Sequence, residues 1–360
     1  MSYLKKNLFF YLYILIILEL VSFFVYKLNL LEISHKPKLY MTDNYMPNYE
    51  WWTEEKEWGS WHKVNAKTKQ KKSCFNVTYK SNEVGARDRT FNDNKEDDIL
   101  LIGDSFAEGY GVNYKDSSQK ILEENIDVNI LNFGVSKNFG PVQYYLIYKN
   151  LAKNYKFNKI IIYLLPDNDF GDNDYNNWSG SKRYRPYYTK LNGFDYDFFI
   201  PVEAKKNYLS STKKIKIIFK NYFWSSGLFI NLNYQYKIYR AKRKNSIEFS
   251  SYFDTPLEQQ KAAIYFIEKI INDTNSDVFL VSIPRPQDFK KNKIQNNLDK
   301  VYWNKYFVNK DKNKSNFTFI DLIKFPPANI SNLYLKCDGH WSPKGNKWAA
   351  EIISSFIKKN

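Results

Sequence analysis

The sequence predicts an α/β protein: a three-layer α/β/α domain with a parallel, flavodoxin-like sheet, an N-terminal transmembrane helix and an inserted cap. From residue 97 onward, apolar runs of strand length alternate with longer segments of helical periodicity, which predicts parallel strands joined by helical crossovers. The clearest run, Ile99 to Ile102, is aliphatic throughout and stops at Gly103-Asp104-Ser105. Because ligands bind beyond the carboxyl ends of buried parallel strands, this run places Ser105 at the expected ligand crevice.

The remaining elements of the sheet domain follow in order along the chain. Ser342-Pro343 and Thr255-Pro256-Leu257-Glu258 each combine a capping residue with a proline, which predicts helix starts. The further core strands are expected at 128–133, 159–165, 278–283 and 317–322, and the helices at 116–125, 141–155, 255–272 and 343–357.

Composition supports a folded, basic protein. The chain has 360 residues, of which 43% are hydrophobic and 18% aromatic, and this is ample for a core. The net charge of +16 is dispersed and no nucleic-acid motif accompanies it, so we expect no nucleic-acid partner and a solvated surface near anionic lipid or glycan. There is no His-Glu-x-x-His pattern or cluster of His and Cys, so we expect neither a metal nor a cofactor.

The N-terminal residues are expected to anchor the protein in a membrane. Residues 8–26 are apolar, follow Lys5 and Lys6, and would span roughly 28 Å as a helix. Glu19 is the one acidic residue in this run, and the many Leu, Ile and Phe residues should outweigh its cost. A cleaved signal peptide is the alternative, but no small-residue cleavage site follows. We expect an uncleaved anchor with the catalytic part outside the cytoplasm, periplasmic or at the cell surface.

This pattern divides the chain into an anchor at 1–30, a stalk and strand-rich lead-in at 31–95, and a catalytic domain at 96–360 that contains an insertion at 170–254. Within the insertion, two short strand-like runs flank Asn192-Gly193, a signal for a two-residue hairpin turn. Residues 213–244 are basic, aromatic and expected to be helical. The insertion could cap the active site and select the substrate, or it could be a surface elaboration without substrate contact.

A nucleophilic serine needs a base to remove its proton and an acid to orient that base. The chain has three histidines, His35, His62 and His340. His35 follows the apolar N-terminal segment and His62 lies in an aromatic, Lys-rich stretch, whereas His340 stands two residues after Asp338 and just before a helix start. Ser105, His340 and Asp338 therefore form the candidate catalytic triad.

Four short blocks together resemble the SGNH/GDSL hydrolase superfamily. Their order and their positions after successive predicted strands make the set more specific than any single tripeptide. Pro166 stands where the third block commonly has glycine, and the usual Asp-x-x-His spacing is shortened to Asp-x-His followed by Trp. This shortened form is similar to the branch that contains alginate-type polysaccharide O-acetyltransferases. The blocks are Gly103-Asp104-Ser105, Asn132-Phe133-Gly134, Pro166-Asp167-Asn168-Asp169 and Asp338-Gly339-His340.

The resemblance implies a reaction and a set of roles. Ser105 would attack an acyl ester of an envelope glycan or lipid, with His340 as base and Asp338 as its orienting acid. The backbone N–H groups of Ser105 and Gly134 and the side-chain amide of Asn168 would form the oxyanion hole. Asp104 and Asp169 would hold their loops through backbone hydrogen bonds.

A serine esterase is therefore our first prediction. The first alternative is an O-acyltransferase that acetylates a cell-surface polysaccharide, with a membrane-bound acyl donor protein as a possible partner. The second alternative is a non-catalytic module that binds a glycan.

Two further features allow two interpretations each. Cys74 and Cys337 could be unrelated buried thiols, or a disulfide that ties the N-terminal segment to the loop of His340, since the chain is expected to leave the cytosol. Residues 82–88 are similar to a segment that precedes the nucleophile strand in membrane-anchored members of the superfamily. The same residues could equally form an ordinary turn with a solvated ion pair.

Overall fold

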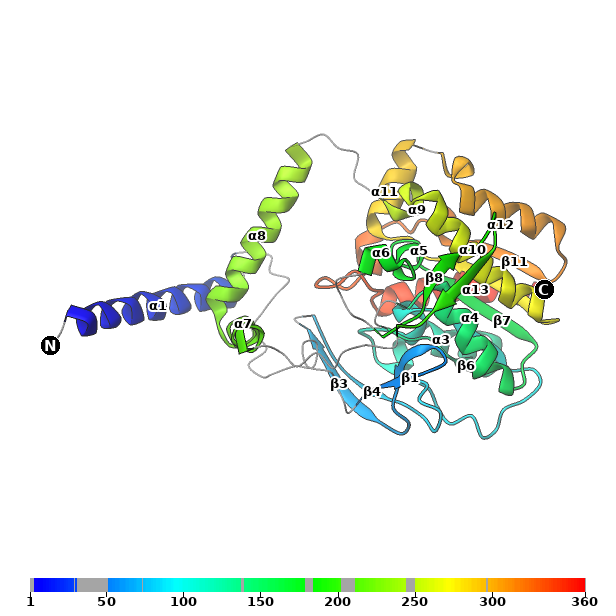
Figure 1. Ribbon diagram of the computed structural model, residues 1–360, viewed down its shortest axis with the longest axis horizontal. Coiled ribbons are helices and arrows are strands. Elements are labelled where there is room, and N and C mark those ends of the chain that lie inside the picture. Colours follow the sequence, from blue (N-terminus) through cyan, green and yellow to red (C-terminus); the bar gives the residue numbers. More distant parts are fainter. Residues whose placement is uncertain are drawn as a thin grey trace.

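A five-stranded parallel sheet forms the centre of the computed structural model (Figure 1). The structure describes residues 3–28, 30, 51–72, 74–136, 139–178, 184–201, 211–243, 250–295 and 297–359. The strand order is β11-β10-β7-β5-β6, and every pairing in this sheet is parallel. The strands are β5 (Ile99–Ile102), β6 (Ile130–Asn132), β7 (Lys159–Leu164), β10 (Asp277–Ser282) and β11 (Phe317–Asp321).

Strand β5 is the hub of this sheet because it pairs with β6 on one side and β7 on the other. All of its residues, Ile99 to Ile102, are at most 1% exposed. A strand buried on both faces needs apolar side chains at every position rather than at alternate ones, which explains the unbroken aliphatic run. The predicted three-layer α/β fold is confirmed in this part of the chain.

Helices cover both faces of the sheet and create two cores. Side chains of α3 and α13 pack with Ile99, Leu101 and Ile161 on one face. On the other face, α4, α10 and α12 pack against Ile160, Ile162 and neighbouring residues. The bounds of these helices are α3 (Ser118–Ile126), α4 (Pro141–Asn150), α10 (Leu257–Asp273), α12 (Tyr302–Asn313) and α13 (Pro343–Ile357).

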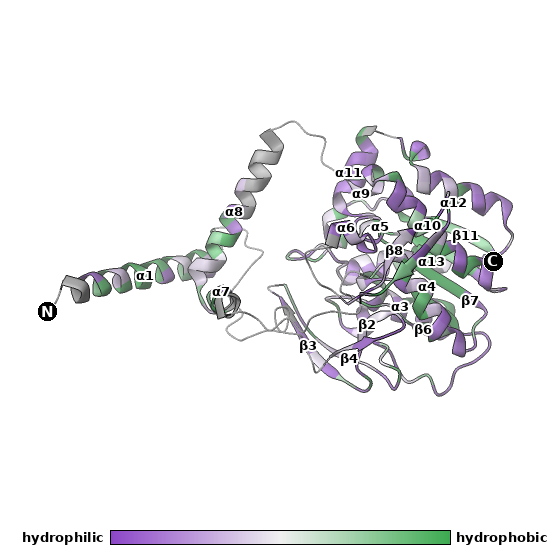
Figure 2. Cartoon of the chain, viewed as in Figure 1, coloured by the Kyte–Doolittle hydropathy of each residue, from purple (hydrophilic) through white to green (hydrophobic). Residues whose placement is uncertain are grey.

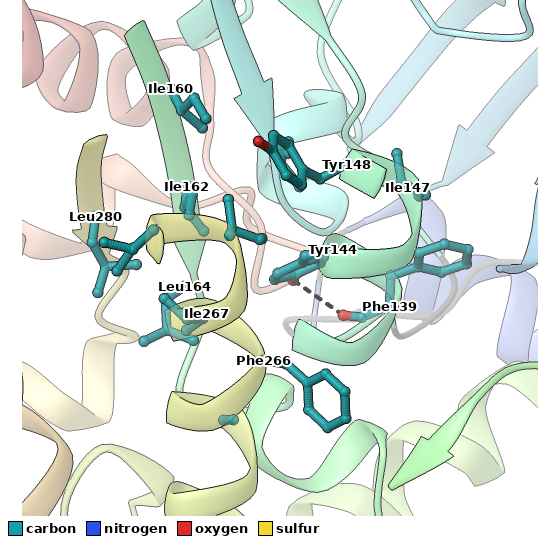
Figure 3. Packing of buried hydrophobic residues seen from close by; sticks show 14 of the residues in the cluster. Phe139, Tyr144, Ile147, Tyr148, Ile160, Ile162, Leu164, Phe266, Ile267 and Leu280 are labelled. Carbon is teal, nitrogen blue, oxygen red and sulfur yellow. Dashed lines mark hydrogen bonds between the residues drawn. The ribbon is translucent and has the colours of Figure 1, made fainter. Parts of the chain in front are cut away.

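Figure 3 shows the second of these cores from close by. Ile162 and Leu164 of β7 point toward Tyr144 of α4 and Ile267 of α10, and all four side chains are fully buried. A buried Tyr needs a partner for its hydroxyl, and that of Tyr144 donates to the carbonyl oxygen of Phe139 at 3.2 Å. This packing holds strand β7 against α4 and α10, and so helps to position the loop that follows β7.

Two antiparallel hairpins precede the sheet domain. They are β1–β2 (Trp52–Glu55 and Gly59–His62) and β3–β4 (Lys67–Lys72 and Phe75–Lys80). A disulfide joins Cys74, in the turn between β3 and β4, to Cys337, and the two Cα atoms lie 5.6 Å apart. The second hairpin is therefore tied to the loop that carries His340.

Helix α1 (Tyr3–Lys27) is apolar and almost entirely exposed over its span Asn7–Lys27 (Figure 2). It is the one helix among the described residues with the length and composition of a membrane-spanning segment, and a signal sequence has the same character. Its C-terminal half packs against α8 (Trp224–Arg243), which follows α7 (Ser211–Tyr222). These three helices lie to one side of the sheet domain (Figure 1).

The insertion was expected to cap the active site, and its described parts pack mainly on α10 and α1. Its hairpin, β8 (Tyr187–Lys190) and β9 (Tyr196–Phe199), packs on α10, where the Tyr196 hydroxyl donates to Glu258 at 2.7 Å. Its long helical part, α7 and α8, extends toward α1 instead. Three residues, 192–194, form the hairpin loop, because Leu191 N–H still bonds to the carbonyl of Asp195. The hairpin loop is therefore one residue longer than the two-residue turn that the sequence predicted.

Several helix boundaries also differ from the expectation. The helix predicted at 141–155 ends at Asn150 and continues only as a short 3-10 turn, Ala152–Asn154. Ser342 caps α13 as predicted, accepting a hydrogen bond from Gly345 N–H. The side-chain cap predicted at Thr255 is absent, because the Thr255 hydroxyl donates to the carbonyl of Ser251. The remaining short helices are α2 (Ser105–Glu108), α5 (Asp169–Asp172), α6 (Tyr175–Trp178), α9 (Ser251–Asp254) and α11 (Pro286–Gln295).

Candidate active site

Ser105 begins helix α2 directly after strand β5. The side chain of Asp104 caps this helix by accepting from Phe106 N–H at 2.9 Å, as predicted for Asp104. Gly103 allows the sharp turn, since a Cβ there would lie 2.8 Å from Cβ of Tyr163 and 2.9 Å from that of Ala107. The strand end, the cap and the close approach of β7 together fix the position of the Ser105 side chain.

His340 lies beside this serine. Its Nε2 is 2.7 Å from the Ser105 hydroxyl oxygen, and its Nδ1 contacts Oδ1 of Asp338. The rings of Tyr110 and Phe106 flank the imidazole, with centroids 4.4 Å and 5.1 Å from its own. A carboxylate on Nδ1 leaves Nε2 unprotonated and able to accept the serine proton. The structure thus brings together the three predicted triad residues in the order that the chemistry requires.

Asp338 has a second partner besides His340, a lysine that the sequence interpretation missed. The ammonium group of Lys72, at the end of β3, contacts Oδ2 of Asp338. Burial would raise the pKa of Asp338, but the hydrogen bond from His340 and the charges of His340 and Lys72 outweigh it and hold the pKa well below its usual range. The acid of the triad therefore stays ionised at any pH at which the protein would work.

Arg285 joins the two loops at this edge of the sheet. It follows β10, and its Nε and one terminal nitrogen lie 3.1 Å from Oδ2 of Asp167. Its other terminal nitrogen donates to the carbonyl oxygen of Gly339. The guanidinium also lies 5.4 Å from the ring centre of Phe106. Arg285 therefore ties the loop of Asn168 to the loop of His340.

The three predicted oxyanion donors differ in their availability. The N–H of Ser105 has no acceptor among the residues that the structure describes. Asn168 Nδ2 donates to Asp172 at 2.8 Å, and because an amide nitrogen carries two N–H groups, one donor remains. Asp169 accepts from Leu165 N–H at 2.7 Å, which fulfils the predicted loop-holding role.

Gly134 has a different role from the predicted one. Its N–H donates to the side-chain oxygen of Asn132 at 2.7 Å. A Cβ at Gly134 would lie 2.5 Å from Cβ of Ala107 and 2.5 Å from the backbone nitrogen of Glu108. In this structure Gly134 therefore permits close packing of its loop on α2 and leaves its N–H unavailable to an oxyanion.

The nucleophile helix rests on a buried charged network. Arg87 donates to the carbonyl oxygens of Glu108 at 2.6 Å, Gly109 at 2.5 Å and Val112 at 2.7 Å, and is 3% exposed. A cation at the C-terminus of a helix is favourable because it meets the unpaired carbonyl groups. The alternative prediction for residues 82–88, a solvated ion pair, is therefore wrong for Arg87, because its side chain is buried.

His62 completes this network and is not part of the triad. Its Nε2 lies 3.3 Å from Oε1 of Glu108, and both side chains are fully buried. Glu108 also accepts from Ser136 N–H at 2.7 Å. Burial would raise the pKa of Glu108, but the bond to His62 and the charges of His62 and Arg87 lower it overall. The Glu108 carboxylate is thus held as an anion behind the nucleophile.

A small pocket lies at the triad. Ser105 and His340 line it together with the aromatic rings of Phe106, Tyr110 and Trp341. No residue of the described part of the insertion lines it. His35 lies outside the described residues. No group of His, Cys, Asp and Glu suited to a metal occurs in the part of the chain that the structure describes.

Neither the family models nor the curated proteins give a match to this sequence. Similar solved structures include a G-D-S-L family lipolytic protein from Desulfitobacterium hafniense, with 14% identity over 72% of this chain and 98% of that chain and a TM-score of 0.37. A lipolytic protein of the same family from Veillonella parvula has 13% identity over 73% of this chain and 99% of that chain, with a TM-score of 0.38.

A family two carbohydrate esterase from Clostridium thermocellum, solved with cellohexaose, has 14% identity over 73% of this chain and 64% of that chain, with a TM-score of 0.35. Because these identities and TM-scores are low, we base the chemistry of the site on the geometry of the triad alone. The family named for the first two structures is the one that the four sequence blocks resemble.

Proposed function

We propose that this protein is a membrane-anchored serine esterase of the SGNH/GDSL type that acts on acyl esters of envelope glycans or lipids. The observation that carries this proposal is the 2.7 Å contact between Nε2 of His340 and the hydroxyl of Ser105, with Asp338 on the opposite ring nitrogen. A nucleophile, a base and an orienting acid within hydrogen-bond reach form the arrangement that acyl transfer to serine requires.

The reaction proceeds in two halves through an acyl-serine intermediate. Ser105 Oγ attacks the ester carbonyl while its proton moves to Nε2 of His340, and Asp338 stabilises the resulting imidazolium. The N–H of Ser105 and the free N–H of Asn168 are the donors proposed for the oxyanion. The alcohol leaves with the proton from His340. Water then attacks the acyl-serine while His340 takes a proton from it, the bond between the acyl carbon and Ser105 Oγ breaks, and His340 returns the proton to Ser105 as the carboxylic acid leaves.

The size of the pocket favours a short acyl group. The pocket has no enclosed space large enough for a water molecule, so it offers no channel for a long acyl chain. The rings of Phe106 and Tyr110 lie with their centroids 5.1 Å and 4.4 Å from that of His340 and leave little room for a long chain. We therefore propose an acetyl ester as the preferred substrate.

The disulfide supports a location outside the cytoplasm. A bridge such as Cys74–Cys337 persists in oxidising compartments and is rare in the cytosol. Together with the apolar helix α1, this bond favours an anchored protein whose catalytic domain faces the periplasm or the cell surface.

Transfer of the acyl group to a glycan hydroxyl is the second candidate. It shares the acyl-serine intermediate and differs only in what attacks it. The observation that favours it is the open site: no described residue of 170–254 lines the pocket, so a bulky polymer could approach Ser105. A non-catalytic glycan-binding module is disfavoured because such a module would have no need for an assembled triad.

The test is an acetyl-release assay on the full chain in detergent or in a reconstituted bilayer. With p-nitrophenyl acetate, butyrate and octanoate, we expect turnover to fall as the acyl chain lengthens, and Ser105→Ala to be inactive. Addition of candidate envelope glycans, followed by mass spectrometry, separates free acetate from acetylated glycan. No turnover of any ester by protein with an intact fold would contradict the proposal.

A further inference from the structure

Helix α8 meets the apolar helix α1 at a partly buried acidic side chain, that of Glu19. The carboxylate of Glu19 accepts hydrogen bonds from the backbone N–H groups of Trp224 at 2.7 Å and Ser225 at 3.0 Å. It also accepts one from the Ser225 hydroxyl. The first turn of α8 therefore supplies hydrogen-bond donors to the carboxylate of Glu19, the one acidic side chain of the otherwise apolar segment.

The two helices cross near the C-terminal end of α1 (Figure 1), and their contacts follow the same order along both. Seven residues after Glu19, the Tyr26 hydroxyl accepts from Asn231 at 3.3 Å, and Asn231 is seven residues after Trp224. The Trp224 ring also packs edge-on against Tyr26 and Phe23, with ring centroids 5.1 Å and 5.3 Å away. On both helices the second contact lies seven residues after the first, nearer the end at which α1 leaves the apolar span.

This pairing sets the depth of α8 relative to α1. Glu19 stands eight residues before Lys27, the end of α1, and is therefore roughly 12 Å inside that end of the span. A hydrocarbon half-layer is roughly 15 Å thick, so a spanning α1 carries Glu19 well below the bilayer surface. Trp224, which contacts Glu19, then lies at the same depth.

Helix α7, which leads into this contact, has an exposed apolar face. Ile215, Ile218, Phe219 and Tyr222 recur at helical spacing, and their exposed fractions are 53%, 43%, 46% and 40%. The same helix contains four lysines and no acidic residue. A helix with apolar residues on one face and several lysines is typical of a segment that lies at the bilayer surface.

Helix α8 continues this apolar surface. Phe229, Leu232 and Tyr236 are 72%, 49% and 58% exposed, and their spacing places them along one side of the helix. Neither α7 nor α8 contains an Asp or Glu. Large apolar side chains at these exposures are unfavourable in water, and their continuity with α1 indicates that one environment covers all three helices.

We propose that α7 and the first half of α8 form a second membrane-embedded element, whose apolar face contacts lipid acyl chains while the exposed Lys216 of α7 meets headgroup phosphates. The elbow between the two helices enters the bilayer beside α1 and supplies the partner of Glu19. This inference rests on the proposed anchor, because it takes α1 to be in the bilayer. The insertion then sets the distance of the catalytic domain from the membrane.

The test uses nitroxide labels on single introduced cysteines in the full chain, reconstituted in phosphatidylcholine vesicles. Both native cysteines are bridged, so only the introduced thiol reacts. The labels go on α7 (Phe219→Cys), on α1 (Ile16→Cys), and on α11 (Ile294→Cys), where Ile294 is a large apolar residue that is 69% exposed and serves as the matched control. Collision with oxygen reports contact with lipid, and collision with a water-soluble nickel chelate reports contact with water.

We expect the labels at positions 16 and 219 to collide several-fold more with oxygen than with the chelate, and the label at 294 to show the opposite. A label at 219 that behaves like the one at 294, while that at 16 remains in lipid, would overturn this inference and leave the anchor intact. Shielding of the label at 219 from both reagents would indicate a protein contact and would also overturn it. Exposure of the labels at both 16 and 219 to the chelate would contradict the proposed membrane anchor as well.

Discussion

The nucleophile and the base of the candidate triad are held in place by two different parts of the molecule. Ser105 follows a central strand whose residues are at most 1% exposed, and the buried residues Arg87, Glu108 and His62 support its helix from behind. His340 lies on a surface loop that no strand of the sheet carries. This loop is held from outside by attachments at its neighbours Cys337, Asp338 and Gly339.

The difference teaches which changes affect the fold and which affect the chemistry. The nucleophile is positioned by the same packing that stabilises the domain, so its surroundings cannot be altered without a loss of stability. The base is positioned by a disulfide and by the charged groups of Lys72 and Arg285, each contributed by a remote segment. Changes to these attachments should alter the activity more selectively.

The largest expected effect comes from removing the nucleophile. Ser105→Ala should lower kcat for acetyl ester hydrolysis by about 10³-fold or more, because the covalent half of the reaction is lost. The midpoint of thermal unfolding should change little, since one oxygen atom leaves a site that opens to a pocket. Activity near that of the wild type would mean that Ser105 is not the nucleophile.

The next effect concerns the oxyanion hole, at the end of the neighbouring strand β7. Asn168→Ala should lower kcat by about 10²–10³-fold with little change in KM, as is typical for the loss of one oxyanion donor. Asn176→Ala, an exposed asparagine on α6, is the matched control and should retain full activity. Equal activities of the two variants would remove Asn168 from the site.

The disulfide tests how firmly the base loop is held. Replacement of Cys74 and Cys337 by serine should lower the free energy of unfolding by about 2–4 kcal/mol, because the bridge closes a loop with a sequence separation of 263 residues. Chemical denaturation with and without reductant measures this loss in the wild type. We also expect a lower kcat from the looser base loop, and an unchanged kcat would show that Lys72 and Arg285 suffice to hold it.

The smallest expected effect concerns Lys72. Its side chain is 32% exposed, so its pairing with Asp338 is partly screened. Lys72→Met should therefore lower kcat/KM by roughly two- to fivefold. The control is Lys69→Met on the same strand, where the side chain is exposed and remote from Asp338 in the strand register.

The same variant has a pH signature that a merely structural lysine would not give. The folded Asp338 stays ionised below the pH at which the unfolded carboxyl takes up a proton, so its contribution to stability is present above about pH 4 and is lost as the pH falls further. Lys72→Met raises the pKa of Asp338 toward its usual value. It should therefore lose less stability than the wild type between about pH 6 and about pH 3, and an equal loss would show that Lys72 does not act on Asp338.

The nucleophile side was predictable from the sequence because its signals are local. An unbroken aliphatic run means burial on both faces, and Gly103-Asp104-Ser105 directly after it places the serine at the sheet edge. Ser342-Pro343 likewise fixed the start of the helix behind His340. Each of these inferences uses residues that are neighbours in the chain.

The attachments on the base side are not local, and this explains why they were missed. Lys72 and Asp338 are separated by 266 residues, and only the expected disulfide, two residues from Lys72 and one from Asp338, could have placed them together. Arg285 lies three residues after the end of strand β10. Because residues after strand ends line the ligand crevice, it could have been predicted as a site residue.

The contacts of Gly134 and of the described insertion were hard to predict for a related reason, because they depend on residues beyond the local pattern. A glycine in a strand-end loop can donate its N–H to a ligand or permit close packing, and the side chain of Asn132 decides for packing here. The insertion was expected above the site because it follows Asn168 in the chain. Its exposed apolar face and the partners of Glu19 direct it to α1 instead.

The most direct test of the triad is covalent labelling by a fluorophosphonate, which phosphonylates an activated serine oxygen and releases fluoride. The full chain is treated with the reagent, digested and sequenced by mass spectrometry. We predict one modified peptide with the phosphonyl group on Ser105, much slower labelling in His340→Ala, and none in Ser105→Ala. Labelling at another serine, or none at all in the folded wild-type protein, would contradict the assignment of Ser105, His340 and Asp338 as a catalytic triad.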